Sequence, residues 1–122
     1  MGYDLAFWKG PRTARKPEAI YIDLQNGVAV PDVEALSMAD VLSALETAFA
    51  GLERLDEHQQ AFWDPADQKT VIEFAWSEQH FVATARGAYT NEQLNTIIDV
   101  GTSVGARLYD PQVDVRFGGE DT

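Results

Sequence analysis

The sequence contains no cysteine, so disulfide bonds and thiolate metal sites are excluded. No apolar run approaches the ~20 residues that a transmembrane helix needs. The first residues show a strand-like pattern instead of a basic segment followed by an apolar stretch, so no secretory signal is expected. Together these absences predict a cytoplasmic protein that does not enter a membrane.

Basic residues are also scarce. The chain has 9 Lys and Arg against 20 Asp and Glu, a formal net charge of −11. Within residues 32–78 the bases are Arg54 and Lys69, whereas four of the nine bases cluster near the start: Lys9, Arg12, Arg15 and Lys16. Such a chain is repelled by nucleic acids and by anionic membranes, and it attracts basic surfaces. Acidity also serves solubility alone, so this charge by itself does not establish a binding function.

Recognisable catalytic patterns are few. The two histidines, His58 in an acidic segment and His80 near a hairpin turn, are both expected to be exposed to solvent. No serine stands in the context of a nucleophile, and no glycine-rich loop precedes a helix as a phosphate site requires. The sequence therefore predicts no enzyme activity, no catalytic residue and no cofactor.

One group of carboxylates could hold a hard cation: Glu57, Asp64 and Asp67. Their spacing matches no calcium-binding loop, because no glycine stands where the sharp turn of such a loop needs one. A solvated acidic loop is the simpler interpretation, and no metal site is predicted.

The length of 122 residues and the apolar content of 45% predict a single domain over residues 1–122. Residues 3–8 are apolar on both alternating rows, which predicts an interior strand. Residues 19–25 fit a strand or a helix equally well. Ser37 caps a helix whose apolar stripe runs to Leu55, and an acidic linker over residues 56–69 follows it.

Residues 70–86 have the alternation of a β-hairpin with a tight turn near residues 78–79. The register pairs residues across one apolar face: Trp76 with Phe81, Phe74 with Ala83, and Ile72 with Ala85. On the other face, Ala75 pairs with Val82 and Glu73 lies diagonal to Arg86.

A second helix is predicted after this hairpin. Thr90 and Gln93 have the spacing of a capping box. Gly101 on the apolar stripe predicts a close approach to a neighbouring element, and Gly105 is suited to end the helix in a left-handed conformation. Residues 106–109 and 113–117 can then pair around the turn at residues 110–112. This order of elements predicts an α+β fold: a small antiparallel sheet with helices on one face, ferredoxin-like or a similar sandwich.

Two segments carry a family resemblance. The opening YDLAFW (residues 3–8), and LNTIIDV (94–100) followed by LYDPQ (108–112), are similar to the signatures of a family of small, largely uncharacterised bacterial proteins. Some of its members resemble immunity proteins, which neutralise toxins delivered by contact-dependent or type VI secretion systems. The resemblance spans nearly the whole chain, and it implies that residues 19–25 are helical.

The resemblance and the charge together predict a cytoplasmic immunity-type protein that binds and neutralises a cognate secreted toxin domain with a basic surface. An intracellular interaction domain without a toxin partner, or a small ligand-binding domain or enzyme, are the alternatives. The candidate partner-binding residues combine acidity with an aromatic anchor of the kind that dominates binding hot spots. They are Asp56, Glu57, Trp63, Asp64, Asp67 and, at the hairpin tip, Glu78.

Overall fold

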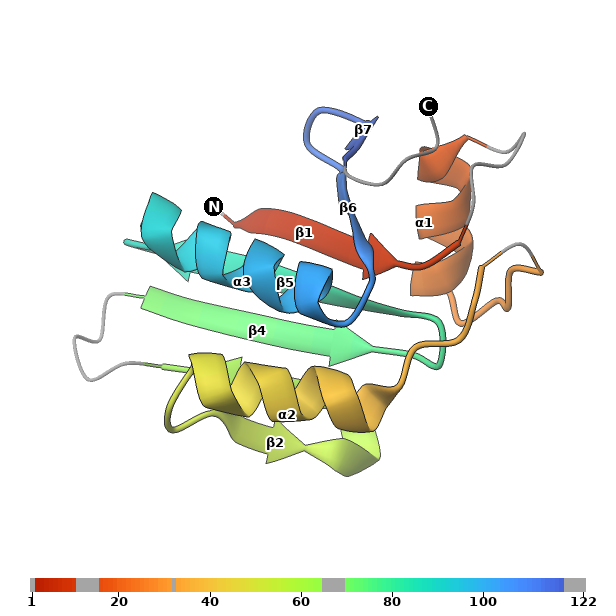
Figure 1. Cartoon of the computed structure of the whole chain (residues 1–122). Helices are drawn as coiled ribbons and strands as arrows, with labels where there is room; N and C mark the ends of the chain where they lie inside the picture. The colour runs from red at the N-terminus through yellow and green to blue at the C-terminus, as the bar shows by residue number, and fades with distance from the viewer. Residues whose placement is uncertain (1, 11–15, 32, 65–69, 118–122) are drawn as a thin grey trace.

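The computed structural model describes residues 2–10, 16–31, 33–64 and 70–117. These residues form one open antiparallel sheet of seven strands, in the order β2-β3-β4-β5-β1-β6-β7 (Figure 1). The strands are β1 (Tyr3–Trp8), β2 (Glu53–Leu55), β3 (Gln60–Trp63), β4 (Thr70–Trp76), β5 (His80–Gly87), β6 (Arg107–Asp110) and β7 (Val115–Arg116). The helices are α1 (Pro17–Gln25), α2 (Met38–Ala48), α3 (Asn91–Ser103) and a short 3₁₀ turn, η1 (Asp56–His58). The predicted α+β class is confirmed.

Helices cover both faces of the sheet (Figure 1). Leu5 and Phe7 of β1 belong to the core beneath α2 and α3. Ala6 and Trp8, which alternate with them, belong to a second core beneath α1. The prediction of an interior strand at residues 3–8 is confirmed. The prediction that the helices share one face is wrong for α1, because β1 is apolar on both rows and the second row also requires cover.

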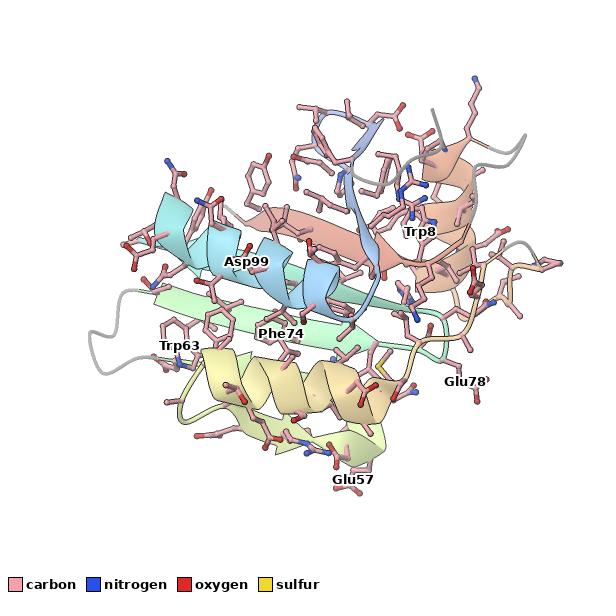
Figure 2. All side chains as sticks on the ribbon, in the orientation of Figure 1. Trp8, Glu57, Trp63, Phe74, Glu78 and Asp99 are labelled. Atoms are coloured by element: carbon pink, nitrogen blue, oxygen red, sulfur yellow. The ribbon has the colours of Figure 1, made fainter. Side chains whose placement is uncertain are left out.

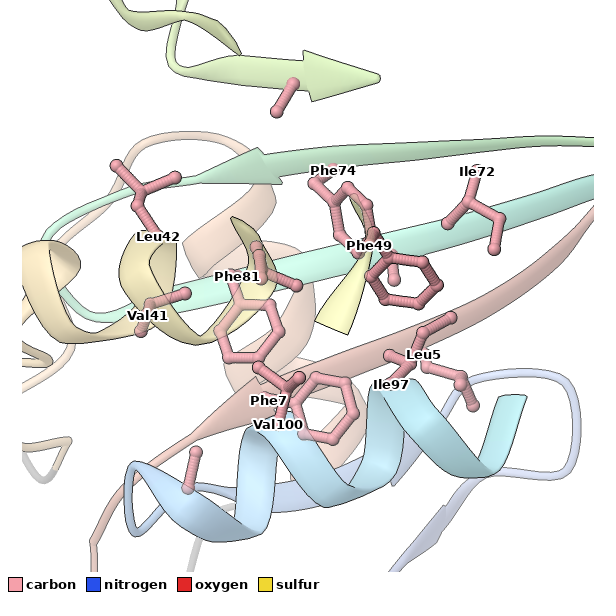
Figure 3. Packing of buried hydrophobic residues seen from close by; sticks show 14 of the residues in the cluster. Leu5, Phe7, Val41, Leu42, Phe49, Ile72, Phe74, Phe81, Ile97 and Val100 are labelled. Carbon is pink, nitrogen blue, oxygen red and sulfur yellow. The ribbon is translucent and has the colours of Figure 1, made fainter. Parts of the chain in front are cut away.

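The larger core combines aliphatic side chains with four buried phenylalanine rings (Figure 3). Phe7 stacks on Phe81 with ring centroids 4.6 Å apart, and Phe49 packs on Phe74 at 5.6 Å. Gly101 of α3 lies directly against the Phe7 ring: a Cβ at this glycine would stand 2.4 Å from Cδ2 of Phe7. The predicted close approach at Gly101 is therefore confirmed.

The hairpin of β4 and β5 has the predicted register. Its pairs on the face beneath α2 and α3 are Trp76 with Phe81, Phe74 with Ala83, and Ile72 with Ala85. On the opposite face Ala75 faces Val82, and Arg86 contacts Glu73 diagonally at 3.4 Å. The period-two pattern was sufficient here because one face is buried and a slip of one residue would expose it.

The segment at residues 19–25 is helical, as the resemblance implied. Pro17 stands at the start of α1, where its missing N–H costs no hydrogen bond. Ile20 and Leu24, one turn apart, are buried against the sheet, whereas Ile22 is 50% exposed. A strand would have put Ile20, Ile22 and Leu24 on one face, and only a helix separates Ile22 from the other two.

The region after Ser37 differs most from the prediction. Ser37 caps α2 as expected, accepting a hydrogen bond from the backbone N–H of Asp40 at 3.3 Å. The helix ends at Ala48, however, and Gly51 turns the chain with a φ of +87°. Residues 53–63 then form the β2–β3 hairpin, which adds to the sheet beside β4. The predicted helix to Leu55 is therefore wrong, and so is the predicted acidic linker over residues 56–63. Residues 65–69 of that linker lie outside the described residues.

The C-terminal part agrees with the prediction in its helix and in the pairing of its two strands, but the last strand is limited to Val115–Arg116, and residues 113 and 114 lie in the turn. Thr90 and Gln93 form the capping box of α3, and Gly105 has a left-handed φ of +79°. β6 and β7 pair across the turn that follows Asp110. In that turn the side chain of Gln112 binds both the backbone N–H of Asp4, at 2.7 Å, and its C=O, at 2.8 Å. Gln112 thus extends the pairing of β6 with β1.

Candidate functional site

The predicted partner-binding residues are divided between two ends of the β2–β3 hairpin (Figure 2). Asp56 and Glu57 begin η1, and the backbone N–H of Trp76 donates to Gln59 at 3.1 Å. This bond places η1 at the same end of the sheet as Glu78. Trp63 and Asp64 lie at the other end of β3, at a distance of about four strand residues or ~13 Å. Asp67 lies outside the described residues.

Trp63 covers the end of the larger core. Its ring centroid is 4.9 Å from that of Phe49, and its indole N–H donates to the backbone oxygen of Ala50 at 3.1 Å. The side chain is half-buried. Its polar atom is therefore already bonded within the fold, and only the exposed part of its ring is open to a partner.

Arg54 binds two carboxylates beside β2. It makes a bidentate pair with Asp56, at 2.8 and 3.0 Å, and contacts Glu46 of α2 at 3.3 Å. The hydrogen bond to Asp56 raises the pKa of this guanidinium further above its usual range. Arg54 is thus held on the surface by acids on both sides, which is the geometry that Arg favours with carboxylates.

These residues belong to a surface that we call the acidic edge. Its carboxylates, all exposed, are Glu46, Glu53, Asp56, Glu57 and Asp64. Arg54 is the only Lys or Arg in residues 37–64, all of which are described. The five acids and one base leave a formal charge of −4 on this surface. Glu46 and Glu53 were not predicted as site residues, because the sequence pattern placed both of them on a helix.

The backbone at this surface is open to a partner. β2 is the first strand of the sheet order, so no strand of the described residues pairs with its outer side. All three of its residues are exposed, including Leu55 at 40%. Unpaired strand edges bind added strands, and charged side chains on them restrict which strands can pair. The acidic edge therefore combines negative charge, free backbone groups and an apolar side chain.

A groove between α2 and α3 continues the negative surface. Its volume is about 470 Å³, and its polar lining includes Asp40, Ser43 and Thr47 from α2 and Thr96, Asp99 and Ser103 from α3. Neither helix contains a Lys or an Arg. The residues that line this groove include two carboxylates and four hydroxyls, and none of them is Lys or Arg.

His80 is buried, so the prediction of an exposed side chain is wrong. Its Nδ1 lies 2.6 Å from Oγ of Ser77, and its Nε2 lies 2.9 Å from Oε1 of Gln25. Because the amide oxygen of Gln25 can only accept, Nε2 carries the proton and the Ser77 hydroxyl donates to Nδ1. Burial lowers the pKa of His80 to about 4, which keeps the ring neutral at physiological pH. His58 is exposed, as predicted.

Gln79 and His80, at the tip of the β4–β5 hairpin, hold α1 and the segment that follows it in place. Gln79 donates from its side chain to the backbone oxygens of Val30 and Val33, at 2.9 and 2.8 Å, and accepts from the N–H of Val30 at 2.8 Å. His80 fixes the end of α1 through Gln25. Sequence reasoning missed this role because the partners lie 46 to 55 residues away along the chain.

In the described part of the chain, no group of three or more His, Asp or Glu side chains could hold a metal ion. Glu57 and Asp64, which the sequence placed in one possible cation site, lie at opposite ends of β3. No helix among these residues has the length and apolarity that crossing a membrane requires.

Known protein-family models and curated protein sequences give no match to this chain.

Proposed function

We propose that this chain is a cytoplasmic immunity-type protein, which binds a cognate toxin domain through the acidic edge and blocks it. The observation that carries the proposal is the state of Arg54: the one cation of residues 37–64 is already bound to Glu46 and Asp56. A basic partner therefore gains attraction from the remaining carboxylates without displacing a positive charge from the site. The proposal gives the chain no catalytic activity and needs no cofactor.

The charge of this surface selects the kind of partner. A formal charge of −4 on one edge accelerates encounter with basic proteins and repels acidic ones. Enzymes that act on nucleic acids carry basic substrate grooves, because phosphate binding requires Lys and Arg. A toxin nuclease is thus a suitable partner, since a protein seated in its groove excludes the substrate.

The open edge of β2 supplies contacts that charge alone does not. Screened charges act mainly on the rate of association, whereas buried contacts determine how slowly a complex dissociates. Backbone groups of β2 and the exposed Leu55 provide the short-range part. Candidate side chains stand at both ends of this strand: Trp63 and Asp64 at one end, and Asp56, Glu57 and Glu78 at the other. They would limit the register in which a strand of the partner could pair with β2.

The fold itself supports a more specific description. We infer that the unit β1, α2, β4, β5, α3 and β6 is a ferredoxin-like core. Its strands have the order β4-β5-β1-β6 with every neighbour antiparallel, and the core beneath both helices is shared. In this description α1, the β2–β3 hairpin and β7 are additions. The acidic edge then belongs to an added hairpin, and function is expected to reside in such additions more than in the core.

Affinity capture from the native host tests the proposal. The baits are the wild-type chain, a triple reversal of the acidic edge (Glu53→Lys, Glu57→Lys, Asp64→Lys), and a control with the same charge change elsewhere (Glu18→Lys, Glu34→Lys, Glu92→Lys). Asp56 is left intact so that its pair with Arg54 survives.

We expect the wild type and the control to capture a protein that has a toxic domain, and the edge variant to lose it. Co-expression of the wild type should rescue cells from that domain. Equal capture by the edge variant would contradict the assignment of the surface. Capture of a partner that harms no cell would favour the interaction domain without a toxin.

A further inference from the structure

A second concave region lies on the side of α3 that faces away from α2. It is a cavity of about 570 Å³ between α3, β1 and the β6–β7 hairpin. Its walls are mainly apolar and come from several elements: Leu5, Leu94, Ile98, Leu108 and Phe117. Phe117 is 44% exposed, which is a large exposure for an aromatic side chain that lines a cavity. The volume and lining are those of small-molecule sites, which are mostly apolar with a few polar groups.

One of those polar groups is a buried carboxylate. Asp110 is 6% exposed and borders the cavity. Its Oδ1 accepts hydrogen bonds from the backbone N–H of Gln112, at 3.0 Å, and from the side-chain amide of Gln112, at 2.6 Å. Its Oδ2 accepts from the hydroxyl of Tyr3. A carboxylate can accept about four hydrogen bonds, so one acceptor position on Oδ2 has no donor among the described residues.

Among the described residues, no cation pairs with this carboxylate. The cavity lining contains neither Lys nor Arg, and the ion pairs between described residues do not include Asp110. Buried acids are otherwise normally paired with a positive group. The hydrogen bond to Asp110 raises the pKa of Tyr3 to about 12, so the phenol keeps its proton and donates to Oδ2 at neutral pH.

Two amides extend the polar end of the cavity. Asn91 and Asn95 stand one turn apart on α3, and both line the same space. Their side-chain oxygens can accept from a group with several N–H donors. An ammonium group has three donors, so it could bind Asp110 and the two amides together, whereas a carboxylate ligand would be repelled by Asp110.

We propose that this cavity binds a small molecule composed of an apolar body and a protonated amine. The ammonium group pairs with Asp110, and the apolar body covers Leu94, Ile98 and Phe117. This site is separate from the acidic edge, and it would persist if the chain had no toxin partner.

Titration of the full chain with three small probes of matched size tests the proposal. The probes are 2-phenylethylamine, the neutral 2-phenylethanol and the anionic 3-phenylpropanoate, each followed at pH 7 by NMR signals of Leu94, Ile98 and Leu108. We expect the amine to bind with a dissociation constant at least about tenfold lower than those of the alcohol and the anion. Equal binding of all three, or no shift of these signals with the amine, would overturn the proposal.

Two variants identify the site. Asp110→Asn should weaken the amine about tenfold or more and leave the alcohol unchanged, whereas Asp99→Asn, which removes the same charge from the other side of α3, should leave both unchanged. Leu94→Trp should abolish amine binding by filling the cavity without a change in charge. Full amine binding by Leu94→Trp would contradict the assignment even if Asp110→Asn fails to fold. Neither result depends on the acidic edge, so a failure here leaves the toxin-binding proposal untouched.

Discussion

Gly101 lies directly against the ring of Phe7, and no side chain at residue 101 would fit between the helix and that ring. A Cβ at residue 101 would lie 2.4 and 2.5 Å from two carbons of that ring. Phe7 cannot move aside easily, because it is 1% exposed and stacked on Phe81. The contact fixes the distance between α3 and the centre of the sheet, and thereby positions the walls of both the groove and the cavity beside α3.

We therefore expect Gly101→Ala to destabilise the protein. Alanine favours a helix over glycine by about 1 kcal/mol, but the clash with a packed core typically costs about 1–3 kcal/mol and should exceed that gain. Thr102→Ala, at an exposed neighbour on the same helix, is the control and should change little. Urea unfolding measures both variants. A Gly101→Ala protein more stable than the wild type would show that Phe7 has room to move.

The buried His80 predicts a particular dependence of stability on pH. Its pKa is about 4 in the folded chain and about 6.5 in an unfolded one. The unfolded state therefore binds a proton first as the pH falls, so the contribution of His80 is fully present above about pH 6.5 and is lost towards pH 4. The loss should reach about 3 kcal/mol at most.

This dependence can be isolated by comparing two histidine variants at pH 7 and pH 4.5. His80→Gln should abolish part of the stability loss that the wild type shows between these values. His58→Gln, which alters an exposed histidine, should retain the wild-type loss. If both variants behave alike, protonation of His80 does not limit stability in acid.

The sequence predicted those parts of the fold in which local and long-range signals agree. The β4–β5 register followed from alternation with one buried face, and α3 followed from its capping box. The β2–β3 hairpin was missed because β2 is short and polar, and its turn uses Gln59 in a left-handed conformation (φ 54°) where Gly or Asn would have been a recognisable signal. The apolar stripe of α2 simply appeared to continue through Leu52 and Leu55.

The sequence showed which residue types the candidate site contains, but it did not show how they are arranged on the surface. Acids between residues 32 and 78 are visible in the sequence, but a linker would have gathered Asp56, Trp63 and Asp64, whereas β3 separates them. The hydrogen-bond partner of the buried His80 ring is Gln25, 55 positions away. The pairing of Arg54 with Glu46 likewise required the turn at Gly51, which the predicted helix excluded.

Trp63 should contribute to stability as well as to binding. Trp63→Ala removes the contact with Phe49 and the bond to Ala50, and for a half-buried indole we expect a loss of about 2–4 kcal/mol. Trp63→Phe keeps a ring on Phe49 and should lose less. Thermal unfolding of the two variants measures this difference. The same variant tests binding once a partner is known. If the partner dissociates faster from fully folded Trp63→Phe than from the wild type, the indole contacts the partner directly.

The most direct test of the central claim is the rate at which the chain associates with its purified partner, measured by stopped flow at several salt concentrations. We predict that Glu53→Lys, Glu57→Lys, Asp64→Lys reduces the association rate at least about tenfold at low salt. The difference should shrink as the screening length falls from ~10 Å at 0.1 M to ~3 Å at 1 M salt. The Glu18→Lys, Glu34→Lys, Glu92→Lys control, with an identical net charge, should stay within about threefold of the wild type. Equal rates for the two triple variants at low salt would contradict the account, because net charge and not the acidic edge would then govern capture.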